Sequence, residues 1–180
     1  MSRRLINLAG LTACFSLLGY ALFAQYSLGL EPCPLCWFQR IGVALLGLVF
    51  LLATLHNPKG WGARVYALFI GLAAALTAGI AARHVYVEHM PAGSLPSCGA
   101  PLEYLVRHTP FSQLSKLIAK VLAGSGECSR IDWTFLNLTM PEWVLICAVA
   151  LGALGVLGNL RGVSVKPPLK ARGMGPTRTA

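Results

Sequence analysis

The sequence predicts an all-α integral membrane protein, a bundle of four spanning helices, because its apolar residues are abundant and come in long blocks. Of its 180 residues, 56% are apolar and only 12% are charged. This composition excludes a disordered or fibrous chain. The long blocks argue against a water-soluble domain, whose elements have one apolar and one polar face.

Four apolar blocks have the length that a spanning helix needs. A helix rises about 1.5 Å per residue, and the hydrocarbon core of a bilayer takes about 20 residues. The second block reaches this length only if Trp37, Phe38 and His56 extend it. We therefore predict spanning helices at about 5–28, 37–56, 65–84 and 143–160.

The first block is expected to be a retained helix rather than a cleaved leader. Arg3 and Arg4 precede it as in a signal peptide, but the apolar stretch is long and has no clear small-x-small cleavage site. The segment 11–14 resembles a lipoprotein box, yet it follows the two arginines too closely to leave room for an apolar h-region.

Basic residues are divided unevenly between the two sides of the predicted bundle. Nine of the 15 Lys and Arg residues lie in the N-terminal segment, the loop between the second and third helices, and the tail, where no acid occurs. The other six share the opposite side with all six acidic residues. By the positive-inside rule both termini are cytoplasmic. The excess charge needs no nucleic-acid partner, since topology and contact with the lipid bilayer account for it.

Residues 1–162 are thus expected to form one transmembrane domain, with outward loops at about 29–36 and 85–142 and a disordered basic tail at 163–180. In the long loop, apolar residues recur at helical spacing from Phe111 to Leu122. This segment is too short and too polar to span, so we predict an amphipathic helix that lies flat on the outer leaflet.

The cysteines separate into two groups by position. Cys14 and Cys147 lie within spanning helices, where a small polarizable side chain packs well. Four cysteines that face one outward compartment are typical of an oxidising environment such as a bacterial periplasm. These four are Cys33, Cys36, Cys98 and Cys128.

A Cys-x-x-Cys pair, Cys33 and Cys36, precedes the second apolar block. Pro34 suits a first helical turn, which places Cys36 near the positive end of the helix dipole. Arg40 follows four residues later on the same face. Both positive charges stabilise a thiolate, so the sequence predicts a nucleophilic Cys36 at the outer membrane surface.

Other chemistries fit these cysteines less well. A static disulfide is an alternative, but a Cys-x-x-Cys pair closes a small loop that gains little from cross-linking and is more often redox-active. A zinc site would want a second close pair, whereas 29 residues separate Cys98 from Cys128. Covalent haem would need histidine at position 37, which is Trp37. We therefore expect no resident metal.

His84 is predicted at the outer end of the third helix, because 20 residues from position 65 cover about 30 Å. It would share its depth with Cys36 and Arg40, and its imidazole could donate a hydrogen bond to a bound carbonyl or carry a proton. The alternative is an interfacial histidine that meets only lipid headgroups. His56 lies at the opposite end of its helix, so the two histidines cannot share one haem.

With these features the chain resembles the bacterial inner-membrane disulfide bond formation protein B family, DsbB. The resemblance rests on four helices, a Cys-x-x-Cys followed by arginine at the head of the second helix, and a second cysteine pair around a flat helix. It covers nearly the whole chain. It implies a thiol:quinone oxidoreductase that reoxidises a periplasmic DsbA-like thiol oxidase and passes the electrons to ubiquinone, or to menaquinone under anaerobic conditions.

The resemblance also implies residue roles. Cys98 and Cys128 would form the disulfide that the partner attacks, with Cys98 making the mixed disulfide. Cys128 would then exchange with Cys33, and electrons would reach Cys36 beside the quinone. Arg40 would support the quinone and His84 would lie near it, which would make Arg40, His84 and Cys36 the quinone-binding residues.

Three alternatives remain at this point. A vitamin K epoxide reductase-like enzyme would use similar chemistry on a four-helix bundle, although its cysteine order matches less well. A DsbB relative dedicated to one oxidase is compatible with the same residues. A small membrane scaffold or channel with structural disulfides would require Cys33 and Cys36 to resist mild reductant.

Overall fold

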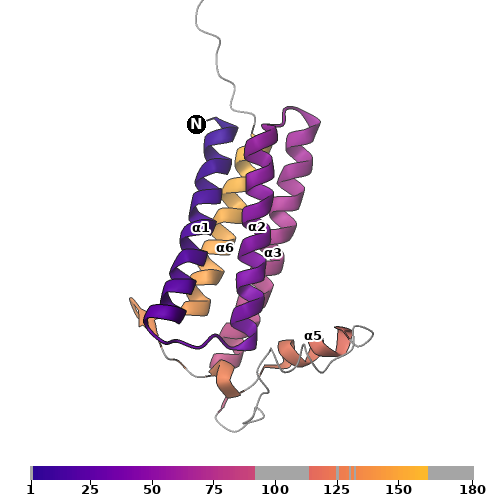
Figure 1. Cartoon of the computed structure of the whole chain (residues 1–180). Helices are drawn as coiled ribbons and strands as arrows, with labels where there is room; N and C mark the ends of the chain where they lie inside the picture. The colour runs from indigo at the N-terminus through magenta and orange to yellow at the C-terminus, as the bar shows by residue number, and fades with distance from the viewer. Residues whose placement is uncertain (1, 92–113, 125, 130, 132, 162–180) are drawn as a thin grey trace, which may run out of the picture.

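A computed structural model describes residues 2–91, 114–124, 126–129, 131 and 133–161. Four long apolar helices, each able to cross a membrane by length and composition, lie side by side (Figure 1). The predicted all-α fold with four spanning helices is confirmed. Their bounds are α1 Arg3–Ser27, α2 Pro34–His56, α3 Trp61–Glu88 and α6 Met140–Leu160.

Five helix ends lie outside the bounds expected from the apolar blocks, because capping and helix-compatible polar residues extend the helices. Two of them are small extensions, since α1 begins at Arg3 and α3 at Trp61. The helix α2 begins at Pro34 rather than near 37, with Cys33 as its N-cap. The helix α3 continues to Glu88. The helix α6 begins at Met140, after a capping box in which the Thr139 backbone N–H donates to the Glu142 carboxylate at 2.7 Å.

The middle of the bundle is organised around the ring of Phe50, which is 1% exposed. A Cβ added to Gly10 of α1 would lie 2.7 Å from Phe50 Cζ, and one added to Gly155 of α6 would lie 2.8 Å from Phe50 Cε1. The two glycines therefore make the space that the ring fills, and small residues let three helices approach closely.

The start of α1 and the end of α6 lie at the same end of the bundle (Figure 1). Two buried amides join them there. Asn159 Nδ2 donates to Asn7 Oδ1 at 2.8 Å, and Asn7 Nδ2 donates back to Asn159 Oδ1 at 3.3 Å. The chain thus enters and leaves the bundle on one side, as four successive spans require.

The other end carries the short elements of the long loop (Figure 1). They are α5 Leu114–Ala123, the 3₁₀ helix η2 Gly126–Ser129, and the strands β1 Thr134–Phe135 and β2 Leu138–Thr139, which pair antiparallel. The predicted amphipathic segment overlaps α5, although residues 92–113 lie outside the described part of the chain. The position of α5 on a membrane surface stays a prediction.

Two contacts hold the C-terminal end of α5 against α3. Arg83 Nε donates to the Leu122 carbonyl at 2.8 Å, and a second guanidinium nitrogen donates to the Ala123 carbonyl at 3.1 Å. Gly124 then turns the chain with a φ of +86°, and a Cβ there would lie 3.0 Å from Val87 Cγ2. Only glycine fits both demands, so this residue sets the path towards η2.

Candidate redox site

Cys33 combines a helix cap with a thiol that contacts Cys36. It is the N-cap of α2, with φ −66° and ψ 165°, and its Sγ accepts a hydrogen bond from the Cys36 backbone N–H at 3.3 Å. Pro34 occupies the first turn, where its missing N–H leaves no bond unmade. This local geometry holds Cys36 in the first turn, with its Sγ 3.2 Å from Cys33 Sγ.

The two sulfurs differ in their surroundings. Hydrogen bonding to the Cys128 side chain, hydrogen bonding to Cys36 and burial raise the pKa of the Cys33 thiol above its ordinary value. The Cys33 thiol donates a hydrogen bond to Cys36 Sγ. The helix dipole and the Arg40 charge both act favourably on negative charge at Cys36.

The structure brings Cys128 from η2 to this pair. Cys128 is 1% exposed, and its Sγ, Cys33 Sγ and a ring nitrogen of His84 all lie within 4.8 Å of one another. Three of the four outward cysteines of the sequence prediction thus meet in one cluster. The fourth, Cys98, lies outside the described residues.

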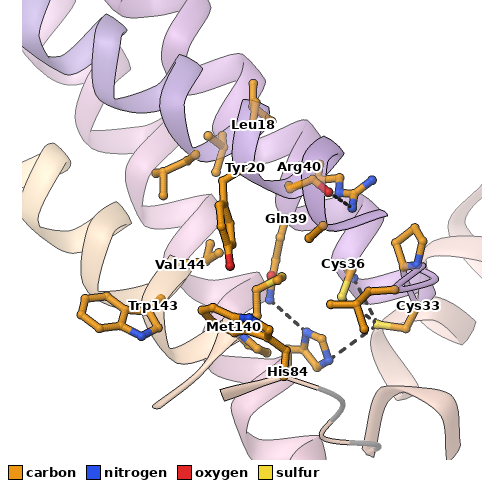
Figure 2. Close-up of a pocket in the computed structure, with 18 of the residues that line it drawn as sticks. Leu18, Tyr20, Cys33, Cys36, Gln39, Arg40, His84, Met140, Trp143 and Val144 are labelled. Carbon is orange, nitrogen blue, oxygen red and sulfur yellow. Dashed lines mark hydrogen bonds between the residues drawn. The ribbon is translucent and has the colours of Figure 1, made fainter. Parts of the chain in front are cut away.

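His84 is 3% exposed and is held from two sides, so headgroup contact does not describe it. Gln39 Nε2 donates to His84 Nδ1 at 3.1 Å, which leaves the ring proton on Nε2. That nitrogen donates to the Cys128 carbonyl at 3.2 Å and lies 3.6 Å from Cys33 Sγ. Figure 2 shows the ring between Gln39 and Cys33.

Gln39 was not identified from the sequence as a site residue, although its polarity within an apolar helix could have indicated one. It is an uncharged polar side chain inside an apolar helix, between Cys36 and Arg40, and it is 4% exposed. A buried amide in such a helix needs a partner, and His84 supplies it.

Arg40 lies at the boundary between α2 and the end of α1. Its guanidinium donates to Gln25 Oε1 and, at 3.0 Å, to the Ala21 carbonyl. It also lies over the Trp37 ring, 5.5 Å from the centroid. These contacts compensate for the partial burial of a permanent charge at this depth.

A cavity of about 460 Å³ opens beside these groups, lined by residues of all four long helices and of β1. Cys33, Cys36, Arg40 and His84 lie on its polar side (Figure 2). Four aromatic rings of the lining, which hydropathy did not single out, follow one another at centroid distances of 5.7 to 6.1 Å. They are Tyr20, Trp133, Phe135 and Trp143.

Comparison with known proteins decides the family. The sequence model of the family described as "Disulfide bond formation protein DsbB" matches residues 3–158. The chain belongs to the DsbB family. It is 48% identical over 157 residues to Disulfide bond formation protein B of Methylococcus capsulatus, covering 87% of this chain and 93% of that protein. It is 45% identical over 162 residues to the protein of the same name from Xylella fastidiosa, covering 89% and 91%.

As a DsbB-family member with four spanning helices, the chain is a multi-pass membrane protein with an oxidoreductase role in disulfide bond formation. The family match covers α1, α2, α3 and η2 in full and α6 up to residue 158. The resemblance drawn from the cysteine pattern is therefore confirmed.

Proposed function

We propose that this DsbB-family protein is a membrane thiol:quinone oxidoreductase. It would reoxidise a periplasmic DsbA-like dithiol oxidase and pass the electrons to ubiquinone, or to menaquinone under anaerobic conditions. The observation that carries the proposal is the cavity beside Cys36, a mainly apolar and aromatic space that a vicinal dithiol, an arginine and a buried histidine also line. Its other polar lining residues include Glu31, Gln39 and Glu88. DsbA is a strong oxidant, so its reoxidation needs a strong acceptor.

The cavity residues suit a quinone ring. Aromatic side chains such as Tyr20 and Trp143 offer flat apolar contact, and the Arg40 guanidinium offers hydrogen-bond donors for carbonyl oxygens. His84 lines the same cavity, although its Nε2 proton is donated to the Cys128 carbonyl in this structure. A bound quinone would supply a two-electron, two-proton acceptor. Arg40 would stabilise negative charge that develops on the sulfur and on the ring oxygens.

The proposed thiol steps balance without another reactant. A thiolate of the reduced partner attacks Cys98 of a Cys98–Cys128 disulfide, and Cys128 leaves as a thiolate. Cys128 attacks Cys33 of a Cys33–Cys36 disulfide, which forms a Cys33–Cys128 bond and releases Cys36 as a thiolate. The second partner thiol resolves the mixed disulfide, which oxidises the partner and frees Cys98. Cys98 then attacks Cys128 of the Cys33–Cys128 bond, which restores Cys98–Cys128 and releases Cys33. Cys33 and Cys36 re-form their disulfide, and a bound quinone would accept the two electrons and two protons.

Two features of the structure support this route. Cys128 already hydrogen-bonds to Cys33 through their side chains, which is the pair that must exchange. The Cys36 sulfur lies in the first turn of α2 and lines the cavity, where a leaving thiolate is stabilised.

We further propose that the protein resides in a bacterial inner membrane with its active cysteines in the periplasm and both termini in the cytoplasm. The charge distribution supports this orientation. So does the separation of the two ends, since the Asn7–Asn159 pair lies at one end and the cysteine cluster at the other (Figure 1).

The experiment is quinone reduction by the full chain in detergent, with a reduced DsbA-like oxidase as electron donor. Cys36→Ser should abolish thiol-dependent loss of ubiquinone. Cys14→Ser is the matched control, because Cys14 packs in the α1 core away from the cavity. Normal turnover by the Cys36 variant would overturn the proposal. Counting the free thiols of Cys33 and Cys36 after mild reduction tests the scaffold alternative. That alternative requires a Cys33–Cys36 disulfide to resist the reductant.

A further inference from the structure

We propose that the reduced protein binds one thiophilic divalent cation, such as Zn²⁺, through Cys33, His84 and Cys128, and that the bound cation blocks thiol exchange. The cation is an inhibitory ligand of the reduced state rather than a resident cofactor. Binding of the cation needs neither a quinone nor a partner protein, whereas the block of thiol exchange rests on the proposed function.

The three ligand atoms already lie at coordination spacing. They fall within 4.8 Å of one another, and Cys33 Sγ is 3.6 Å from His84 Nε2. Tetrahedral zinc, with Zn–S near 2.3 Å and Zn–N near 2.0 Å, places a sulfur and a nitrogen ligand about 3.5 Å apart. A cation therefore fits between Cys33 and His84 with little movement of either side chain.

The charge of the ligand set suits a buried dication. Cys33, His84 and Cys128 are 8%, 3% and 1% exposed. Two thiolates and a neutral imidazole cancel the charge of Zn²⁺, which avoids an uncompensated charge at a site shielded from water. Each thiol that becomes a ligand releases its proton to solvent, so binding strengthens as the pH rises.

Gln39 is in place to orient the imidazole as a ligand. Its amide now donates to Nδ1, while Nε2 donates to the Cys128 carbonyl. Coordination through Nε2 moves the ring proton to Nδ1, and rotation of the Gln39 amide presents Oε1 to accept it. A hydrogen bond to the other ring nitrogen is the usual support of a metal-bound histidine.

The fold, not the spacing along the chain, makes this set. Along the sequence, Cys98 and Cys128 are too far apart to supply the second close cysteine pair that is typical of a zinc site. The structure instead joins the N-cap of α2, the last turns of α3 and the 3₁₀ helix η2. Gly124 and the Arg83 contacts direct the chain that delivers Cys128.

Blocking of exchange follows from the identity of the ligands. Cys33 and Cys128 are the two sulfurs that must react with each other in the proposed relay. A cation held by both removes them as nucleophiles until it dissociates. Any disulfide that includes either sulfur removes a ligand, so the cation binds only the reduced protein.

The test is direct metal binding to the full chain in detergent, reduced and then freed of reductant under anaerobic conditions, with Co²⁺ as the spectroscopic probe and Zn²⁺ as competitor. The parent for this test carries Cys14→Ala, Cys98→Ala and Cys147→Ala, which leaves only Cys33, Cys36 and Cys128 as thiols. We expect one Co²⁺ per chain, thiolate-to-cobalt and tetrahedral d–d absorption, displacement by Zn²⁺, and loss of the signal after oxidation.

Variants in this parent assign the ligands. His84→Asn and Cys128→Ser should each weaken binding by more than Gln39→Leu, which should weaken it about tenfold. His89→Asn is the matched histidine control, because His89 caps α3 on the exposed surface. Cys36→Ser should retain the cation while losing quinone reduction driven by a small dithiol, a donor that does not need Cys98. This separates failure of this inference from failure of the proposed function.

Three results would overturn the inference. One is the absence of stoichiometric Co²⁺ binding to the reduced parent. Another is equal binding by the parent and the His84 and Cys128 variants. The third is loss of the cation in Cys36→Ser, which would move the site to the vicinal pair.

Discussion

The two ends of the bundle treat buried polar groups in opposite ways. At the end that holds the start of α1 and the end of α6, Asn7 and Asn159 satisfy each other, and the surrounding contacts are helix on helix. At the other end, Arg40 and His84 are hydrogen-bonded by neighbours and also border a cavity. In one place polarity joins helices. In the other it lines a cavity.

The largest effect should come from Cys128→Ser, which removes the sulfur that links the long loop to Cys33. Turnover with a reduced DsbA-like oxidase should fall to about a thousandth or less, because the only route from the partner is cut. A small dithiol that reaches Cys33 and Cys36 directly should still drive quinone loss. Comparing the two donors in one assay checks this, and equal loss with both would indicate a folding defect instead.

Arg40→Met should weaken quinone use next most strongly. It removes the charge beside Cys36 and the cavity, so kcat/KM for quinone should fall about a hundredfold. Arg40→Lys keeps the charge but not the two hydrogen bonds to α1, so it should lie between wild type and Arg40→Met. Steady-state kinetics at varied ubiquinone measure this. An unchanged kcat/KM in Arg40→Met would exclude a role at the cavity.

Asn7→Leu should affect stability and leave activity alone. The change leaves the side-chain oxygen Oδ1 of Asn159 without its Asn7 donor. It should lower the unfolding free energy by about 1 kcal/mol. The double variant Asn7→Leu/Asn159→Leu should recover part of the loss, because it removes both buried amides. Thermal unfolding in detergent, read beside quinone reduction per folded molecule, tests this. A loss of quinone affinity would contradict the separation of the two ends.

Arg83→Met should have the smallest effect on global stability. Its two hydrogen bonds to the last carbonyls of α5 hold that helix against α3. Losing them should speed hydrogen exchange in α5 and η2 while the long helices stay protected. Arg83→Lys, which can restore one bond, is the control. Unchanged exchange in α5 would show that Val121 and Gly124 suffice to place it.

The sequence predicted what depends on local pattern. Apolar blocks located the four helices, and helix length placed His84 at the level of Cys36. Pro34 and the Cys-x-x-Cys spacing predicted a cysteine in the first turn of α2. Each conclusion needs only the rise of a helix and the preferences of its first turn, both of which are readable from neighbouring residues.

Contacts between distant segments could not be predicted in the same way. That His84 meets Cys128 depends on the path of the loop after α5, which Gly124 and Val87 determine by close approach. The aromatic lining depends on a hairpin that brings Trp133 and Phe135 to Tyr20. Hydropathy counts such rings as generic apolar residues, so it carries no signal about which cavity they border.

The sulfur that caps α2 is also one of the atoms that would react in the proposed relay. When Cys33 Sγ bonds to another sulfur, the backbone N–H of Cys36 loses the thiol acceptor that it has in this structure. A side-chain cap stabilises a helix start by about 1 kcal/mol, so the oxidation state of the pair is coupled to the order of one backbone turn. The amide proton of Cys36 is therefore expected to report on the oxidation state of the pair.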